Sequence, residues 1–227
     1  MTSTRHVVSA VRAAPRVVIV KTGVANIASV LAAFHRLGAV TELSTDPDTI
    51  ASADFVMLPG VGAFAAGMAA LGGKDGALAL ALKSRFSSDR PTMAICLGLQ
   101  LLAAVSDESP GVSGLSIFET SHVGRFSPID IDEPRSNARG LKVPQLGWNE
   151  VVPDEGARLL TRGFAYFANS YRLTDAPPGW VAARAHYGGL FVAALERGPH
   201  LACQFHPELS GPWGQALIAR WLEGVSC

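Results

Sequence analysis

The sequence lacks an excess of charge of either sign, because 19 lysines and arginines are balanced by 19 aspartates and glutamates. This balance excludes a basic surface field that would attract nucleic acid, and also an acidic tract that would keep the chain disordered. The sequence has no apolar run as long as the roughly 18 residues that a membrane span requires. We therefore expect no nucleic-acid and no membrane partner, and a small-molecule substrate or a protein partner fits better.

Cysteine is scarce as well. The three cysteines, Cys96, Cys203 and Cys227, are an odd number in a sequence without a recognisable secretory leader, which is typical of reduced thiols and predicts a cytoplasmic protein. No phosphate-binding P-loop or dinucleotide fingerprint occurs in the sequence. Cys203 and His206 form a C-x-x-H pair, but metal sites of this kind need a second pair of ligands. We therefore predict neither a metal nor another cofactor.

No linker rich in proline, glycine or serine divides the chain, and its 227 residues suffice for one α/β domain with a sizeable core. We predict a flexible N-terminal extension over residues 1–15 and a single domain over residues 16–227. The extension carries arginines but no acidic residue, which faintly resembles a transit peptide. A frayed terminus explains this composition equally well.

Strand and helix patterns alternate through the first half of the chain. Apolar runs typical of buried parallel strands are separated by stretches in which apolar residues recur at helical spacing. After about residue 107, short alternating strands with many turn residues indicate antiparallel pairing. We therefore predict an α/β fold, with an open, mixed and mostly parallel sheet flanked by helices and an additional antiparallel part. The expected early strands are 16–20, 39–43, 53–58 and 93–95, and the expected helices are one starting after Asn26, 77–86 and 211–224.

The stretch PTMAICLGLQ, residues 91–100, is the strongest candidate for a reactive site. If 93–95 end a buried strand and 97–105 form a helix, Cys96 is held on the sharp turn between them, like a nucleophile elbow. The free N–H groups and the dipole of a helix N-terminus favour the thiolate, which is the attacking form of cysteine. On this run alone, a small buried hydrophobic cysteine is the commoner interpretation.

A base for such a nucleophile can come from the last apolar strand, HLACQF, which is followed by His206, Pro207 and Glu208. Because His206 and Glu208 are two positions apart, their side chains leave the end of a strand on the same side. Glu208 can then hold the imidazole in one tautomer while His206 exchanges a proton with Cys96. The other histidines have weaker claims, and surface or structural roles are expected for them.

Residues 59–67, PGVGAFAAG, form a glycine-rich loop after the third expected strand. Glycine permits backbone conformations that a Cβ forbids, which suits a loop whose N–H groups face a ligand. An ordinary strand-to-helix turn explains these glycines equally well. Since open parallel sheets bind ligands beyond the carboxyl ends of their strands, we expect this loop and Cys96 at the same edge.

The strings AICLGLQ and QFHPE together resemble the triad signature of class I glutamine amidotransferase domains, and the match in order and spacing covers nearly the whole chain. Within that family, PGVGAF, LGWNEV and YFANSY are similar to the glutaminase subunits of imidazole glycerol phosphate synthases. The resemblance implies hydrolysis of glutamine to glutamate and ammonia, with Cys96 as nucleophile, His206 as base and Glu208 as orienting carboxylate. It implies an oxyanion hole from backbone N–H groups of Leu97 and of Val61 and Gly62. The glutamine contacts that it implies are Gln100, Asn169, Ser170 and Tyr171.

The same resemblance implies a partner. This is a (β/α)8-barrel cyclase subunit that takes up the ammonia to form imidazole glycerol phosphate and an aminoimidazole carboxamide ribotide in histidine biosynthesis. The subunits would form a heterodimer with Asn26, Trp148 and Tyr166 at partner-facing positions, although the two aromatic residues could be core and Asn26 only a helix cap. Two other functions stay open: a glutaminase that serves another synthase or acts alone, and a catalytically idle subunit that only stabilises a partner.

The sequence departs from the family pattern at several positions. Asn169 and Gln145 stand where histidine is common, and Leu209 stands beside the triad glutamate where lysine is usual. In the loop KTGVAN, Ala25 replaces a usual glycine. These changes bear on how a partner docks and how it is coupled to the site, and none of them removes a member of the triad.

Overall fold

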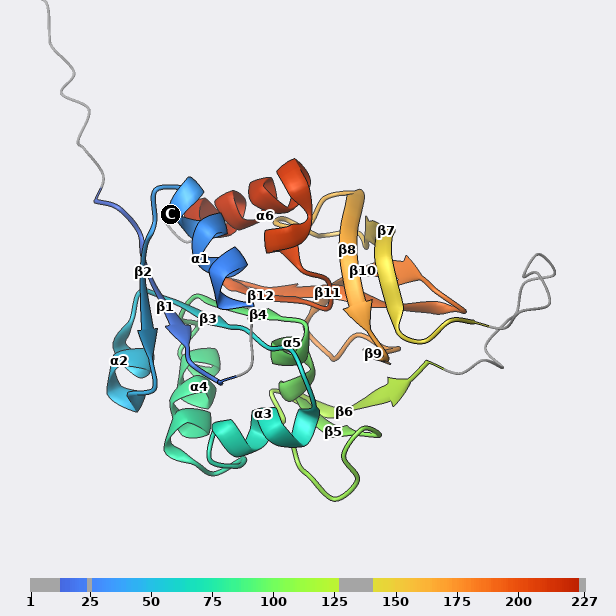
Figure 1. The fold of residues 1–227 in the computed structure, drawn as a ribbon, viewed down its shortest axis with the longest axis horizontal. Helices are drawn as coiled ribbons and strands as arrows, with labels where there is room; N and C mark the ends of the chain where they lie inside the picture. Colours follow the sequence, from blue (N-terminus) through green and yellow to red (C-terminus); the bar gives the residue numbers. More distant parts are fainter. Residues whose placement is uncertain (1–12, 24–25, 127–140, 225–227) are drawn as a thin grey trace, which may run out of the picture.

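The computed structural model describes residues 13–23, 26–126 and 141–224. In this part of the chain the strands form a nine-stranded and a three-stranded sheet, and helices cover both faces of the larger one (Figure 1). The smaller sheet consists of β5 (Ala103–Ser106), β6 (Phe118–Arg125) and β9 (Tyr171–Leu173). The larger sheet runs in the order β2 (Val40–Ser44), β1 (Arg16–Val20), β3 (Phe55–Leu58), β4 (Thr92–Ile95), β12 (His200–Cys203), β11 (Leu190–Arg197), β10 (Val181–His186), β7 (Gln145–Pro153) and β8 (Gly163–Asn169).

The larger sheet has a parallel and an antiparallel part that meet at β12. Neighbouring strands from β2 to β12 pair in parallel, whereas β11, β10, β7 and β8 pair antiparallel with their neighbours. The sequence pattern accounts for the division: β3 and β4 are buried along their whole length, whereas β7 mixes buried and exposed positions. This mixed sheet with flanking helices confirms the predicted fold class.

Hydrophobic clusters cover the two faces of the larger sheet. The helices α1 (Ile27–Arg36) and α6 (Gly211–Gly224) pack on one face, where the rings of Phe34 and Trp221 lie 6.4 Å apart edge to face. Figure 1 shows these two helices on the side of the sheet opposite to the remaining helices. Those that pack on the second face are α2 (Pro47–Ser52), α3 (Phe64–Ala70), α4 (Ala77–Ser87) and α5 (Leu97–Leu101).

The helix that was predicted over residues 97–105 is wrong in its second half. α5 ends at Leu101, and Ala103–Ser106 form the strand β5. The backbone of β5 pairs in parallel with β6, so long-range strand pairing takes the place of further helix. A local pattern of apolar residues does not reveal this pairing.

Two further elements differ from the expectation. Helix α3 begins at Phe64, inside the loop that was predicted over 59–67. Helix α2 was not predicted from the sequence, although Asp46 caps it by accepting a hydrogen bond from the Thr49 N–H at 2.8 Å. Most of the predicted extension, residues 1–15, lies outside the described residues. Among the described residues, no helix is long and apolar enough to span a membrane.

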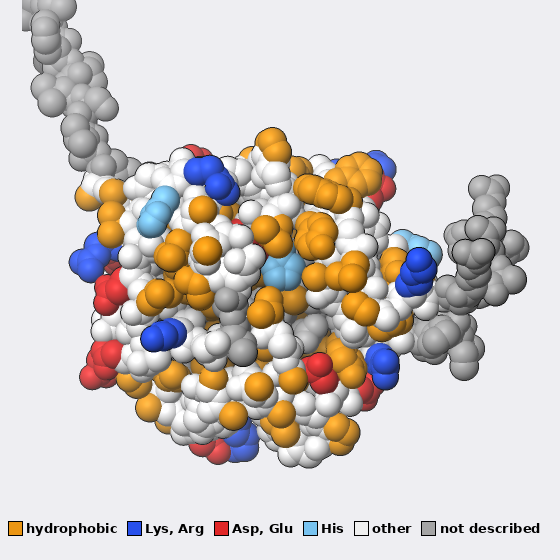
Figure 2. Space-filling model, viewed as in Figure 1, with side chains coloured by type: hydrophobic (Ala, Val, Ile, Leu, Met, Phe, Trp, Pro, Cys, Tyr) orange, Lys and Arg blue, Asp and Glu red, His pale blue; other side chains and the backbone are white. Residues whose placement is uncertain are grey.

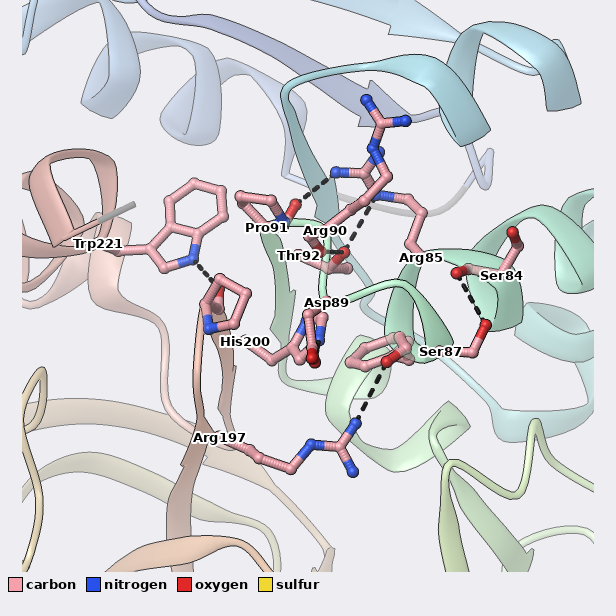
Figure 3. Close-up of polar contacts among 12 residues, drawn as sticks. Ser84, Arg85, Ser87, Asp89, Arg90, Pro91, Thr92, Arg197, His200 and Trp221 are labelled. Carbon is pink, nitrogen blue, oxygen red and sulfur yellow. Dashed lines mark hydrogen bonds and ion pairs between the residues drawn. The ribbon is translucent and has the colours of Figure 1, made fainter. Parts of the chain in front are cut away.

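The amino-terminal ends of β3 and β4 are held by a buried arginine on α4. The guanidinium of Arg85 donates to the Pro91 carbonyl oxygen at 2.6 Å and to the Thr92 hydroxyl at 3.1 Å (Figure 3). It also donates to the carbonyl oxygen of Ala53 at 2.7 Å, just before β3. Burial lowers the pKa of Arg85 to about 10, so it remains a cation at neutral pH. This end of the sheet is the one opposite to Cys96, and its role is structural.

His200 lies at the same end, at the start of β12, and its side chain is fully buried. Its ring lies 4.6 Å from the ring of Phe86. Its Nε2 is 3.4 Å from Asp89 Oδ1 (Figure 3), and neither ring nitrogen has a hydrogen-bond partner among the described residues. Burial and the nearby charge of Arg197 lower the pKa of His200 to about 4. His200 is therefore neutral in the folded protein at neutral pH.

Candidate active site

Cys96 is positioned by the junction of β4 and α5. Its backbone has a φ of 53° and a ψ of −108°, which is strained for a residue with a Cβ. The Cys96 N–H donates to the carbonyl oxygen of Cys203 on β12 at 2.7 Å. Gly98 lies so close to Leu58 that a Cβ would overlap the Leu58 carbonyl oxygen. The structure thus places Cys96 on the predicted sharp turn, at the start of α5.

His206 and Glu208 follow β12, but their side chains meet for a different reason than the predicted one. The strand ends at Cys203, and Glu208 lies in the 3-10 turn η1 (Pro207–Leu209) instead of on extended chain. The turn brings Glu208 Oε1 to within 2.8 Å of His206 Nδ1. The backbone N–H of His206 donates to the Tyr166 carbonyl oxygen at 2.9 Å, which fixes the histidine against β8.

The imidazole of His206 lies between the Cys96 sulfur and the Glu208 carboxylate. Burial by itself lowers the pKa of His206, but hydrogen bonds with Cys96 and Glu208 outweigh it and raise the pKa to about 10. The imidazole is therefore protonated at neutral pH and places a positive charge beside the Cys96 sulfur. The three side chains together offer a nucleophile, a proton carrier and a carboxylate that orients it.

A cavity of about 250 Å³ opens onto Cys96 and His206. It is smaller than the roughly 300–1,000 Å³ that drug-sized ligands occupy, so it suits a small polar substrate. Larger hollows of about 620 and 610 Å³ lie beside β1 and β2 and beside the end of α6, and none of the described residues that line them is a cysteine or histidine. The residues that line the cavity are Val61, Gly62, Cys96, Leu97, Gln100, Glu108, Ala168, Asn169, Ser170, Tyr171 and His206.

The predicted oxyanion donors lie at this cavity, but they are not yet arranged to receive an oxyanion. The N–H of Leu97 already donates to the carbonyl oxygen of Gly60 at 3.2 Å. Gly62 has a φ of 105°, a conformation that glycine tolerates and other residues rarely adopt. A Cβ on Gly60 would come within 2.7 Å of the Leu97 Cβ. The loop therefore needs glycine at both positions, and in this conformation its own carbonyl oxygen occupies the N–H of Leu97.

The predicted substrate contacts surround the cavity in two ways. Gln100 Nε2 and Asn169 Nδ2 both donate to the Tyr171 carbonyl oxygen, at 3.2 Å and 3.0 Å. The Ser170 carbonyl oxygen accepts a hydrogen bond from the Phe126 N–H at 3.0 Å. The two amide side chains thus fix the backbone of 169–171, and this backbone forms one wall of the cavity.

Two residues at the site were not predicted from the sequence. Glu108 lines the cavity, and its carboxylate accepts a hydrogen bond from the Phe64 N–H at 2.6 Å. Gln204 is fully buried behind Cys96, with its Nε2 3.8 Å from the sulfur. Gln204 could have been found, because it precedes His206 by two positions and follows a strand directly. No local pattern marks Glu108, whose position depends on the course of the chain after β5.

The positions predicted to face a partner lie on different elements. Trp148 on β7 is 58% exposed and lies edge to face with the half-buried Tyr166 on β8, at 6.3 Å between ring centroids. Leu146 and Phe164 are exposed on the same two strands, and Figure 2 shows hydrophobic side chains spread across the face it displays, with most charged groups nearer its edge. Asn26 caps α1 and accepts a hydrogen bond from the Ser29 N–H at 3.4 Å. The core alternative is therefore wrong for Trp148. Asn26 does cap α1, and it is also exposed, so the cap does not exclude a contact with a partner.

The departures from the family pattern have local consequences. Gln145 and Asn169 are cross-strand partners on β7 and β8, both are buried, and each has a side-chain oxygen without a hydrogen-bond partner among the described residues. Leu209 is 37% exposed beside Glu208. The Oε2 of Glu208 is buried and has no hydrogen-bond partner among the described residues. His206 is therefore the only described group that is hydrogen-bonded to this carboxylate. Ala25 lies outside the described residues.

Comparisons with known proteins show which family this chain resembles. The model of the family "Glutamine amidotransferase class-I" matches residues 19–224. The chain is 38% identical over 210 residues to the imidazole glycerol phosphate synthase subunit HisH of Symbiobacterium thermophilum, covering 91% of this chain and 92% of that one. It is 38% identical over 211 residues to the subunit of the same name from Escherichia coli K12, covering 91% and 98%.

Solved structures with low sequence identity share the fold. A crystal structure of a glutamine amidotransferase matches with a TM-score of 0.68 at 18% identity, over 92% of this chain and 99% of that one. PurLQS from Thermotoga maritima matches with a TM-score of 0.68 at 14% identity, over 93% and 99%. The fold, the extent of the family match and the identity to curated relatives agree, and the chain belongs to the class I glutamine amidotransferase family.

Proposed function

We propose that this chain is the glutaminase subunit of an imidazole glycerol phosphate synthase, and that it hydrolyses glutamine with the triad Cys96, His206 and Glu208. The observation that carries the proposal is the contact of these three side chains at the wall of a small cavity. The identity of 38% to subunits named HisH supports the choice of synthase. No metal or other cofactor takes part in this proposal.

The proposed reaction has two stages. The Cys96 sulfur bonds to the side-chain amide carbon of glutamine. As the tetrahedral intermediate collapses, His206 gives its proton to the amide nitrogen, the carbon–nitrogen bond breaks and the nitrogen leaves as ammonia. Water then attacks the thioester and loses a proton to His206 while the thiolate of Cys96 leaves, which yields glutamate. Glu208 keeps the imidazole oriented through its 2.8 Å hydrogen bond.

The oxyanion of each tetrahedral intermediate needs two donors, and the loop must move to supply them. Rotation of the peptide between Gly60 and Val61 removes the Gly60 carbonyl from the Leu97 N–H and turns the Val61 N–H toward the cavity, beside Gly62. One such donor contributes roughly 100- to 1,000-fold to the rate. We therefore expect the isolated subunit to be slow and a partner that favours the rotated loop to activate it.

Groups around the cavity suit the two charged ends of glutamine. The carboxylate of Glu108 is placed to attract the α-ammonium group, and the N–H groups of the wall formed by 169–171 suit the α-carboxylate. Gln100 and Asn169 hold this wall through the Tyr171 carbonyl, while Ser170 lies in it. The substrate-binding positions in the proposal are thus Gln100, Asn169, Ser170 and Tyr171, with Glu108 in addition.

The proposed partner is a (β/α)8-barrel cyclase in a cytoplasmic heterodimer. It takes up the ammonia to form imidazole glycerol phosphate and an aminoimidazole carboxamide ribotide. The exposed face of β7 and β8 around Trp148 and Tyr166, together with the start of α1 at Asn26, is the proposed docking surface. Its exposed aromatic ring is a typical anchor of protein interfaces.

The test measures glutamate formation by the full chain alone, with the cyclase, and with the cyclase and its nucleotide ligand. We expect slow turnover alone and a strong increase with the liganded cyclase. Cys96→Ala should abolish glutamine-driven product formation but leave the reaction with ammonium salt intact, whereas Cys203→Ala, a matched loss of a buried thiol, should retain both. Glutamine-driven activity of Cys96→Ala would overturn the triad, and a failure of diazo-oxo-norleucine to label Cys96 would indicate an idle subunit. Activation by a different synthase alone would overturn the choice of partner.

A further inference from the structure

Gln204 is a buried amide that the triad does not account for. It follows β12 directly, in a bend two residues before His206, and its backbone N–H donates to the Ala193 carbonyl oxygen at 2.8 Å. Its side chain is fully buried, and the Nε2 atom lies 3.8 Å from the Cys96 sulfur. A buried amide side chain is costly unless its polar atoms are paired, so the partners of Gln204 determine which atom faces the sulfur.

These partners fix the direction of the amide. The Tyr171 carbonyl oxygen can only accept, so the atom of Gln100 that bonds it at 3.2 Å must be the Nε2 donor. The same Nε2 donates to Gln204 at 3.1 Å, which requires the Oε1 atom of Gln204 on that side. The remaining amide atom, the Nε2 donor, therefore faces Cys96. The Tyr171 carbonyl oxygen thus determines, through Gln100 and Gln204, that a hydrogen-bond donor and not an acceptor faces the sulfur.

A donor at this place favours one form of the sulfur. A thiolate accepts hydrogen bonds well, whereas a neutral thiol is a weak acceptor. Four ionisable groups lie near the sulfur. His206 contacts it, and Glu208 is bonded to His206. Glu108 lines the same cavity, and the buried Cys203 lies on the neighbouring strand β12. Of these groups only His206 brings a positive charge, and the amide of Gln204 adds a second donor to the sulfur.

We propose that Gln204 is a further catalytic residue, whose side-chain amide donates to the Cys96 sulfur and stabilises it as a thiolate, and that Gln100 orients this amide. The part of Gln204 in turnover rests on the proposed glutaminase function. Gln204 gives up no proton, and no bond to it forms or breaks. In the second stage, when the carbon–sulfur bond breaks and the electron pair returns to sulfur, the amide lowers the barrier by stabilising the leaving thiolate.

The relay also joins the nucleophile to the substrate wall. Gln100 lines the cavity, and the Tyr171 carbonyl that anchors it belongs to the backbone wall of 169–171. A change in the position of this wall changes the orientation of Gln100 and, through it, of the donor at sulfur. The glutamine site and the reactivity of Cys96 are thus connected through two side chains.

The test follows the alkylation of Cys96 by iodoacetamide in the full-length chain without partner, with the modified peptide quantified by mass spectrometry as a function of pH. In Gln204→Met, which keeps the volume but has no donor, the midpoint of the profile should rise by roughly one pH unit, which corresponds to a tenfold lower acid dissociation constant of the thiol. Gln145→Met is the matched control, because it removes another buried glutamine that makes no hydrogen bond with Cys96 in the described part of the chain. Its midpoint should not move.

A midpoint for folded Gln204→Met equal to that of the wild type would overturn the proposal. If that variant does not fold, Gln100→Met carries the test, because it retains Gln204 but removes the donor that orients it. Its midpoint should rise as well, and an unchanged value would refute the relay. The profile reports on sulfur alone, so it stays informative if the wild type fails to hydrolyse glutamine with the cyclase, a result that would overturn the proposed function instead. With the active complex, Gln204→Met should lower kcat more than it raises KM.

Discussion

Replacing His200 with phenylalanine should make the stability of the protein less sensitive to acid. The pKa of His200 is about 4 in the folded protein because of burial and the charge of Arg197, whereas it is near 6.5 in an unfolded chain. Between these two pKa values, His200 therefore binds a proton in the unfolded state but not in the folded state. The contribution of neutral His200 to the free energy of unfolding is therefore fully present above pH 6.5, and it is lost as the pH falls toward 4.

The size of the effect follows from the difference between the two pKa values. One unit corresponds to about 1.4 kcal/mol, so the wild type loses about 2 kcal/mol from this group by pH 5 and about 3 kcal/mol by pH 4. His200→Phe preserves the ring packing against Phe86, 4.6 Å away, and has no proton to gain. Carboxylates titrate in the same pH range in both proteins, so the difference between the wild type and the variant in the free energy of unfolding reports on His200 alone.

The assay is urea unfolding of both proteins between neutral pH and pH 5. We expect the wild type to lose about 2 kcal/mol more of its free energy of unfolding than His200→Phe over this interval. His35→Phe serves as control, since His35 lies on the exposed side of α1, and it should follow the wild type. Parallel pH profiles for the wild type and His200→Phe would refute the reasoning that burial keeps this histidine neutral.

Three other substitutions test the scaffold and the surface. Gly98→Ala should lower the free energy of unfolding by about 3 kcal/mol in thermal or urea unfolding, since its Cβ would overlap the Leu58 carbonyl oxygen; an unchanged midpoint would contradict the close contact. Arg85→Met should cost about 3 kcal/mol or more in the same assay, because buried carbonyl groups lose their donor, and a loss below about 1 kcal/mol would contradict this role. Trp148→Ala should weaken cyclase binding by about 2 kcal/mol in calorimetry while diazo-oxo-norleucine still labels the free subunit; undiminished affinity would exclude Trp148 from the interface.

The sequence predicts the parallel part of the fold well, because its signals are local. The apolar run of β1 and the cap of α1 at Asn26 appear in the structure where the pattern places them. The failures arise where distant chain decides the outcome: residues 103–106 pair with β6 instead of extending α5, and α3 starts at Phe64, whose N–H bonds the distant carboxylate of Glu108. Neither contact leaves a periodic trace in the sequence.

The positions of the triad residues in the candidate site could be predicted from the sequence, but their local geometry could not. Cys96, His206 and Glu208 could be proposed from their places after apolar strands, and the structure brings them together. The reason given for Glu208 was wrong, because a 3-10 turn and not strand alternation aims its carboxylate. The occupied N–H of Leu97 could not be predicted, since it depends on the exact course of a glycine loop whose residues tolerate several conformations.

The insertion of β12 between β4 and β11 has a consequence for how the protein is made. Ile95 pairs with Cys203 across these strands, so the cysteine and its base meet only when a loop of about a hundred residues closes, at a chain-entropy cost of about 4 kcal/mol. During synthesis, Cys96 leaves the ribosome long before His206 does. Under the proposed mechanism, a nascent or truncated chain therefore exposes Cys96 without His206, and we expect glutamine hydrolysis only in a protein whose last strand has entered the middle of the sheet.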